Sequence, residues 1–147
     1  MLEGEGGERM KQPVLLMYNL SGERARAVSV AAMRLKIRVR RVSPEEYALP
    51  LAILCGLEGE TEEGAPVCPF EEEMLVMALF PAGMMNAFLQ AMRRAGISPV
   101  ALKAVLTPTN AAWNSVRLHE ELSREREAIL RGTAGAHADS QPQAERK

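Results

Sequence analysis

The sequence has few of the residues that usually mark a chemical function. Only 4% of its 147 residues are aromatic, and it contains two histidines and two cysteines. Two cysteines are too few for a disulfide framework, and a zinc site needs about four ligands in clustered pairs. We expect Cys55 to be a core residue, and no base beside Cys68 marks it as a nucleophile. Metal, disulfide and cysteine chemistry therefore find no support in the composition.

Neither sign of charge is in excess. The 18 basic residues nearly balance the 19 acidic ones, giving a formal net charge of -1, which excludes a global basic field for nucleic acid. No apolar run approaches the roughly 20 residues of a transmembrane helix. The first 12 residues also lack the apolar segment of a signal peptide. These features predict a cytoplasmic protein that does not contact a membrane.

What is present is one folded domain between two segments without a periodic apolar face. Such segments bury too little surface to offset the entropy of ordering, so we expect them to be disordered. The chain divides into an N-terminal tail (1–12), a single α+β domain (13–131) with an internal repeat (13–56 and 70–131) around an acidic loop (57–69), and a C-terminal tail (132–147).

Each half of the domain contains an unbroken apolar run, a helical stripe and an alternating run. The unbroken runs are Val14–Tyr18 and Met74–Phe80, and the alternating runs begin at Ile37 and Val100. Two β-α-β units predict a four-stranded ferredoxin-like sheet with a C-terminal helix, in which the unbroken runs are central strands and the alternating runs edges. A compact, doubly wound α/β sheet is the alternative. Gly96 is placed to end the second helix in the left-handed conformation.

The middle of the chain predicts a short, broken helix. Ser43 and Glu46 can form a capping box, but Pro50 interrupts the helix, which we expect to end near Gly56. Both predicted central strands are apolar on both faces, whereas the helices of a ferredoxin-like sheet cover only one. The broken helix, the C-terminal helix or a second subunit must therefore cover the other face, because a monomer rarely exposes such a patch.

The segment richest in chemical groups is 103–113, where Thr107 to Asn110 is predicted to start the last helix, which runs to about Arg131. On one interpretation, the helix amides and a nearby lysine bind a small anion, and Trp113 stacks against a ring. On the other, which capping chemistry favours, Thr107 or Asn110 caps the helix and Trp113 fills the core. The candidate ligand-binding residues are Lys103, Thr107, Thr109, Asn110 and Trp113.

The string LKAVLTPTNAAW in this segment resembles the signature of a small bacterial family catalogued as a domain of unknown function. That family is found mostly in anaerobic Gram-positive bacteria. The string is followed by Leu118, Glu121, Leu122 and Glu125, and VLLMYNL at 14–20 fits the family's opening. The resemblance implies a stand-alone cytoplasmic bacterial protein and favours a ligand near Thr107. It brings no established activity, cofactor or catalytic residue with it.

Two further features have a structural and a functional interpretation. Arg38, Arg40 and Arg41 are the nucleic-acid candidates, but no aromatic residues interleave with them, and charge on an edge strand also prevents sheet-to-sheet pairing. Nucleic-acid binding is therefore not expected. His119 lies on an otherwise charged helix, where we expect a surface residue.

Together these patterns predict a non-enzymatic binding or regulatory module that self-associates through an apolar sheet face, with a small anionic ligand as a further option. One alternative is an enzyme acting on a small phosphorylated or carboxylated metabolite, and another is a weak nucleic-acid-binding protein. No phosphate loop, dinucleotide fingerprint or metal-binding motif occurs in the sequence. We therefore assign no cofactor, metal ligand or catalytic residue.

Overall fold

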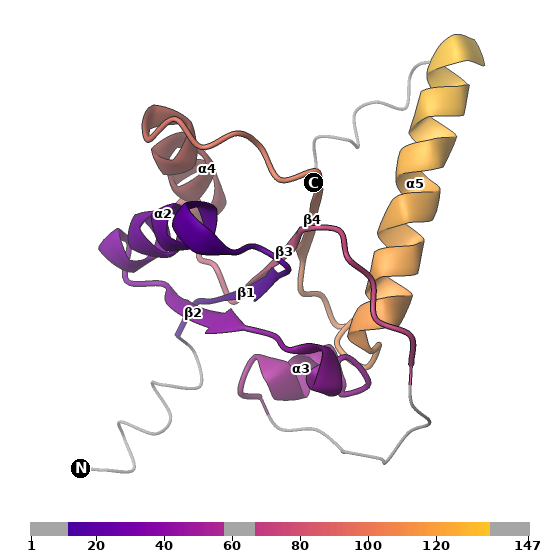
Figure 1. Cartoon of the computed structure of the whole chain (residues 1–147), viewed down its shortest axis with the longest axis horizontal. Helices are drawn as coiled ribbons and strands as arrows, with labels where there is room; N and C mark the ends of the chain where they lie inside the picture. The colour runs from indigo at the N-terminus through magenta and orange to yellow at the C-terminus, as the bar shows by residue number, and fades with distance from the viewer. Residues whose placement is uncertain (1–11, 58–66, 136–147) are drawn as a thin grey trace.

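The computed structural model describes residues 12–57 and 67–135, so most of both predicted tails and of the acidic loop lies outside it (Figure 1). The last helix continues past Arg131, where we expected it to end. The elements in chain order are β1 (Val14–Tyr18), α2 (Gly22–Arg34), β2 (Arg38–Arg41), η1 (Pro44–Glu46), α3 (Leu51–Leu54), β3 (Met74–Ala78), α4 (Met84–Arg94), β4 (Leu102–Val105) and α5 (Ser115–Gly135).

The four strands form one mixed sheet in the order β2-β1-β3-β4. β1 pairs with β2 and β3 with β4 in parallel, while β1 and β3 pair antiparallel at the centre. The prediction that the unbroken runs are central strands and the alternating runs edges is confirmed. The ferredoxin-like order is wrong, because that fold splits each β-α-β unit with a strand of the other, whereas here the two strands of each unit are neighbours.

The doubly wound alternative is also wrong, since its sheet is mostly parallel with crossover helices on both faces. Here both crossover helices, α2 and α4, lie on the same face (Figure 1). Leu15 and Met17 of β1 and Met77 of β3 point to this face, where they pack with Val28 of α2 and Phe88 of α4. The first face is therefore covered by the helices that the repeat predicted.

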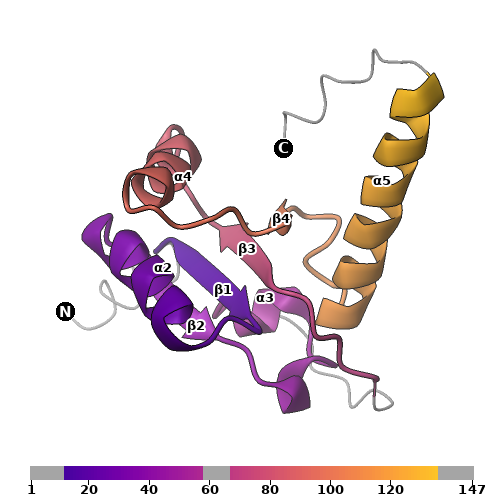
Figure 2. The ribbon, with the colours of Figure 1, turned by 45° about the horizontal axis from the view of Figure 1, so that its top comes forward.

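The broken helix and the start of α5 cover the second face of the sheet. Leu16 and Tyr18 of β1 pack there against Tyr47, Leu51 and Leu118, all of which are buried. Figures 1 and 2 show α3 and α5 on the side opposite α2 and α4. Of the three elements that we considered for this role, the broken helix and the C-terminal helix both cover the second face. Covering it therefore needs no second copy of the chain.

Two of the predicted helix boundaries can be compared with the structure: the end of the second helix at Gly96 and the break at Pro50. Gly96 has φ 78°, and the amide of Ile97 donates to the carbonyl of Met92, so the predicted left-handed end of α4 is confirmed. The broken helix begins as a single 3-10 turn, in which the Ser43 amide donates to Glu46 Oε1 at 3.1 Å, and resumes as α3 after Pro50. Gly56, with φ 86°, follows its end.

Arg24 joins the two halves of the domain at one end of the sheet. From the first turns of α2 its guanidinium reaches Glu73, with Nε–Oε2 at 2.7 Å and Nη2–Oε1 at 2.8 Å. Its Nη1 also donates to the carbonyl and the hydroxyl of Ser98, at 3.0 and 2.9 Å. This bidentate, charge-assisted pairing fixes α2 to the segments that precede β3 and β4.

A buried pair of hydroxyl groups fixes the start of α5 to β1. Tyr18 Oη and Ser115 Oγ lie 2.7 Å apart, and both residues are fully buried. Burial raises the pKa of the Tyr18 hydroxyl, although the hydrogen bond to Ser115 opposes the change. Neither hydroxyl can exchange this partner for water, so losing one partner leaves the other unsatisfied.

We expect Ser115→Ala to lower the free energy of unfolding by about 1–3 kcal/mol, because it leaves the buried Tyr18 hydroxyl without its partner. The double variant Ser115→Ala with Tyr18→Phe should lose less stability than the sum of the two single losses, since both polar groups are then absent. Urea unfolding of the four proteins measures the coupling. Strictly additive effects would show that the two hydroxyl groups do not stabilise each other.

Candidate functional site

The segment 107–114 is a closed turn, and the prediction that a helix begins at Thr107 is wrong. Asn110 is buried, with Oδ1 accepting from the Thr107 amide at 2.9 Å and Nδ2 donating to the Val105 carbonyl at 3.1 Å. The Asn110 amide in turn donates to Thr107 Oγ1 at 3.1 Å. The error has a simple cause: threonine and asparagine use the same bonds to close a turn as to cap a helix.

The N-cap of α5 is Asn114, which the sequence reasoning missed. Its Oδ1 accepts from the Arg117 amide at 2.8 Å. The free amides that we expected beside Thr107 are therefore not there. The amides that meet this turn belong to α3: Leu51 donates to the carbonyl of Trp113 at 2.9 Å, and Ala52 donates to that of Ala111 at 3.0 Å. The turn thus docks the second half of the chain on the first.

Trp113 is half-buried against the core of the second face, and the guanidinium carbon of Arg117 lies 4.4 Å from its ring centroid. Asn110 and Trp113 are thus engaged in contacts that hold the turn, while Thr107 and Thr109 are exposed on it. Of the five ligand-binding candidates, Lys103 and Thr107 line a common cavity, and the other three are not part of its lining.

That cavity is a groove of about 490 Å³ between α4 and α5. Lys103, Ala104 and Val105 of β4 form its floor, and Figure 2 shows β4 between the two helices. Met85 and Leu89 line it on α4, and Leu122 and Glu125 line it on α5. Most of the lining residues are apolar, but polar atoms, including those of one cation and one carboxylate, supply nearly half of the lining surface. The volume lies within the range of about 300–1,000 Å³ that is usual for ligand sites.

The floor of the groove includes the open edge of the sheet. The Leu106 amide donates to the carbonyl of Met77 on β3 at 2.9 Å. Because amide direction alternates along a strand, the amides of Lys103 and Val105 point away from β3. Val105 is 40% exposed. The outward amides of Lys103 and Val105 are therefore presented to whatever occupies the groove, whereas the outward carbonyl of Val105 already accepts from Asn110 Nδ2 at 3.1 Å.

Lys103 is a half-buried cation. Its Nζ donates to the carbonyl of Val100 at 2.7 Å, and burial lowers its pKa. Among the described residues no carboxylate forms an ion pair with it, although Glu125 lines the same groove. An ammonium group has three donors, so Lys103 retains capacity for an anionic partner.

The opposite edge of the sheet carries the nucleic-acid candidates. Arg40 is tied to the fold, since its guanidinium pairs with Glu46 and donates to the carbonyl of Leu54 at 3.3 Å. Arg38 and Arg41 are exposed at the two ends of β2. This edge matches the charged pattern that prevents pairing between sheets, in contrast to the open edge at β4.

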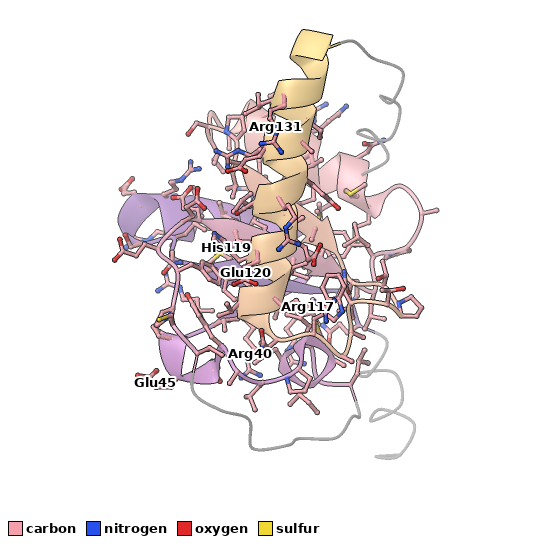
Figure 3. All side chains as sticks on the ribbon, turned by 90° about the vertical axis from the view of Figure 1, so that its right-hand side faces the viewer. Arg40, Glu45, Arg117, His119, Glu120 and Arg131 are labelled. Carbon is pink, nitrogen blue, oxygen red and sulfur yellow. The ribbon has the colours of Figure 1, made fainter. Side chains whose placement is uncertain are left out.

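His119 is not the surface residue that we expected. Its side chain is only 17% exposed, and its ring stacks on Phe70 with centroids 4.1 Å apart and an interplanar angle of 5°. Its Nε2 lies 2.8 Å from Glu72 Oε1. Figure 3 shows His119 near the base of α5. The charged residues around it in the sequence gave no sign that the segment before β3 packs against this helix.

The two thiols have opposite environments. Cys55 is buried and Cys68 is exposed, and burial raises the pKa of the Cys55 thiol from 9.0 to about 11. Because folding favours the neutral thiol, this contribution to stability is complete below pH 9 and is lost as the pH rises towards 11. Within 12–57 and 67–135, no group of three His, Cys, Asp or Glu residues is placed to hold a metal ion.

The chain folds as a mixed α/β domain built from two β-α-β units, with a groove at one edge of its sheet. Residues 73–129 match the family model described as "Domain of unknown function (DUF3783)". The resemblance to a family of unknown function is therefore confirmed over 73–129, whereas VLLMYNL at 14–20, which we also attributed to the family, lies outside the match. Every residue that lines the groove lies within the matched segment.

No curated protein and no solved structure matches the chain. A further finding concerns the helices: none in the described parts of the chain is both long enough and apolar enough to cross a membrane.

We expect Asn114→Ala to cost about 0.5–2 kcal/mol of stability, because α5 loses its cap. Asn110→Ala should cost at least as much, since the buried Asn110 side chain makes two hydrogen bonds that close the turn. Thr109→Ala is the matched control within the same turn and should stay within about 0.5 kcal/mol of the parent. Chemical denaturation measures all three; an Asn114→Ala protein as stable as the control would contradict the assigned cap.

The thiols should react at very different rates with a disulfide reagent at pH 8. Cys68 is exposed and should react quickly, whereas Cys55 should react only when the protein unfolds, because it is both buried and protonated. Absorbance counts the thiols released before and after urea is added. Cys68→Ser should abolish the fast phase, and a fast phase that survives in this variant would show that Cys55 is accessible.

Proposed function

We propose that the protein is a non-enzymatic binding module whose groove accepts an extended peptide as an added strand beside β4. The observation that carries this proposal is the open edge on the floor of the groove, where the amides of Lys103 and Val105 point away from the sheet. Addition of a strand satisfies such groups with main-chain hydrogen bonds, and flanking side chains supply selectivity.

The groove favours a single extended segment over a second sheet. Residues of α4 and α5 line it on either side of β4, so the edge is recessed between two helices. A paired strand must come within about 4.8 Å of its neighbour. A lone peptide can do so, whereas a second domain that brings its own helices meets α4 and α5 first. The four residues of β4 limit the pairing to a short segment.

The lining supports binding over catalysis. Lys103 and Glu125 are its two charged groups, and they do not form an ion pair with each other among the described residues. The enzyme alternative depended on free helix amides beside Thr107, and the turn at that position does not offer them. The nucleic-acid alternative would use Arg38 and Arg41 at the other edge, with no aromatic platform between them.

A proline at Val105 should weaken peptide binding and leave the fold intact. It removes an outward amide and places a ring in the path of the added strand, without removing a hydrogen bond to β3. Arg41→Pro is the matched control, because Arg41 pairs with Met17 of β1 as Val105 pairs with Met77 of β3. Random seven-residue peptides displayed on phage supply the probes, and selected peptides are then synthesised and measured by fluorescence polarisation.

We expect the parent and Arg41→Pro proteins to bind the selected peptides equally and Val105→Pro to bind them at least tenfold more weakly. Amide chemical shifts of the parent should move at Lys103 and Val105 and stay constant at Arg41, which tests the site even if the proline variant unfolds. Failure to select any peptide, or equal binding by Val105→Pro, would disprove the proposal. A parent dimer that Val105→Pro converts to a monomer would also disprove it, by assigning the edge to a second copy.

A further inference from the structure

Lys103 is placed to select the peptide. Its register partner on β3 is Leu75, which packs on the face covered by α2 and α4, so the Lys103 side chain lies on that face. Ala104, the next residue, packs on the opposite face. A strand added beside β4 would place alternate side chains on these two faces, about 4.5–5.5 Å from the directly opposed residues of β4.

The electrostatic environment of Lys103 favours a carboxylate beside it. Lys103 is half-buried, and the acceptor that its ammonium contacts is the neutral carbonyl of Val100 at 2.7 Å, while Glu125 of the same groove forms no ion pair with it. Its burial also lowers the pKa of the amine, which is the expected response of a cation without an anionic partner. A carboxylate forms a shorter and stronger bond to an ammonium than a neutral acceptor does.

We propose that the peptide carries an acidic side chain that pairs with Lys103, flanked at the second position on either side by apolar residues. This inference rests on the proposed strand addition. The apolar residues follow from the lining on this face, which Met85 and Leu89 of α4 share with Lys103. The ligand class is thus a short extended segment with an apolar-x-acidic-x-apolar pattern, in which the acidic group gives selectivity and the backbone gives much of the affinity.

Three synthetic peptides that differ only at the central position test the acidic group: acetyl-TVTETVT-amide, acetyl-TVTQTVT-amide and acetyl-TVTKTVT-amide. Both ends are blocked, so the glutamate side chain is the only carboxylate in the set. Binding is measured by titration of amide chemical shifts against the parent protein, Lys103→Gln and Lys103→Glu. Lys36→Gln is the control, because Lys36 is an exposed lysine that does not line the groove.

We expect the parent and Lys36→Gln proteins to bind the Glu peptide at least fivefold more tightly than the Gln peptide. Lys103→Gln should lose this preference, and Lys103→Glu should prefer the Lys peptide. Equal binding of the Glu and Gln peptides by the parent would overturn the inference and leave strand addition standing. Binding of phage-selected peptides without binding of this set would have the same meaning, whereas loss of all peptide binding would overturn strand addition itself.

A fourth peptide, acetyl-TVTQTVT with a free C-terminal carboxylate, separates the two sources of a carboxylate. We expect it to bind no more tightly than its amidated counterpart. Tighter binding that depends on Lys103 would assign the lysine to a chain terminus and overturn the side-chain pairing.

Discussion

The antiparallel pairing of β1 and β3 is the constraint from which the rest of the structure follows. Both strands are buried along their whole length, so the sheet needs a cover on each face. The two crossover helices supply the first cover, and α3 with the start of α5 supplies the second. The turn at 107–114 belongs to this second cover, because its carbonyls receive the amides of α3. Residues that looked like a binding motif in the sequence therefore serve the closure of the core.

The hydrophobic pattern predicted which strands are central and where α4 ends, but not the order of the strands. Periodicity reports which side of a strand is buried, and that is the same whether the two strands of a β-α-β unit are neighbours or are split by another strand. Gly96 was predictable because a positive φ strongly favours glycine. The left-handed Lys36 that ends α2, with φ 63°, was not, because lysine carries no such signal.

The candidate site shows the same limit at the level of single residues. Lys103 was singled out because it lies near the helix start that we predicted at Thr107, but its cavity is formed by β4, α4 and α5, whose proximity only the fold establishes. Asn114 was missed in favour of Asn110, since both are residues that cap helices, and only the position where α5 begins distinguishes them. The sequence did contain one indication that the β4 edge differs from the β2 edge. β2 carries three arginines, whereas Lys103 is the one charged residue of β4.

The two edges of the sheet differ in charge, so a further strand is expected to pair at β4 and not at β2. At β2 the arginines disfavour pairing with a further strand. At β4 the outward amides of the edge can still pair with one. Copies of a chain with two open edges can join into a fibre, whereas copies with a single open edge can join only as a pair. Any association of this chain with itself through β4 therefore ends at two chains and cannot continue into a fibre.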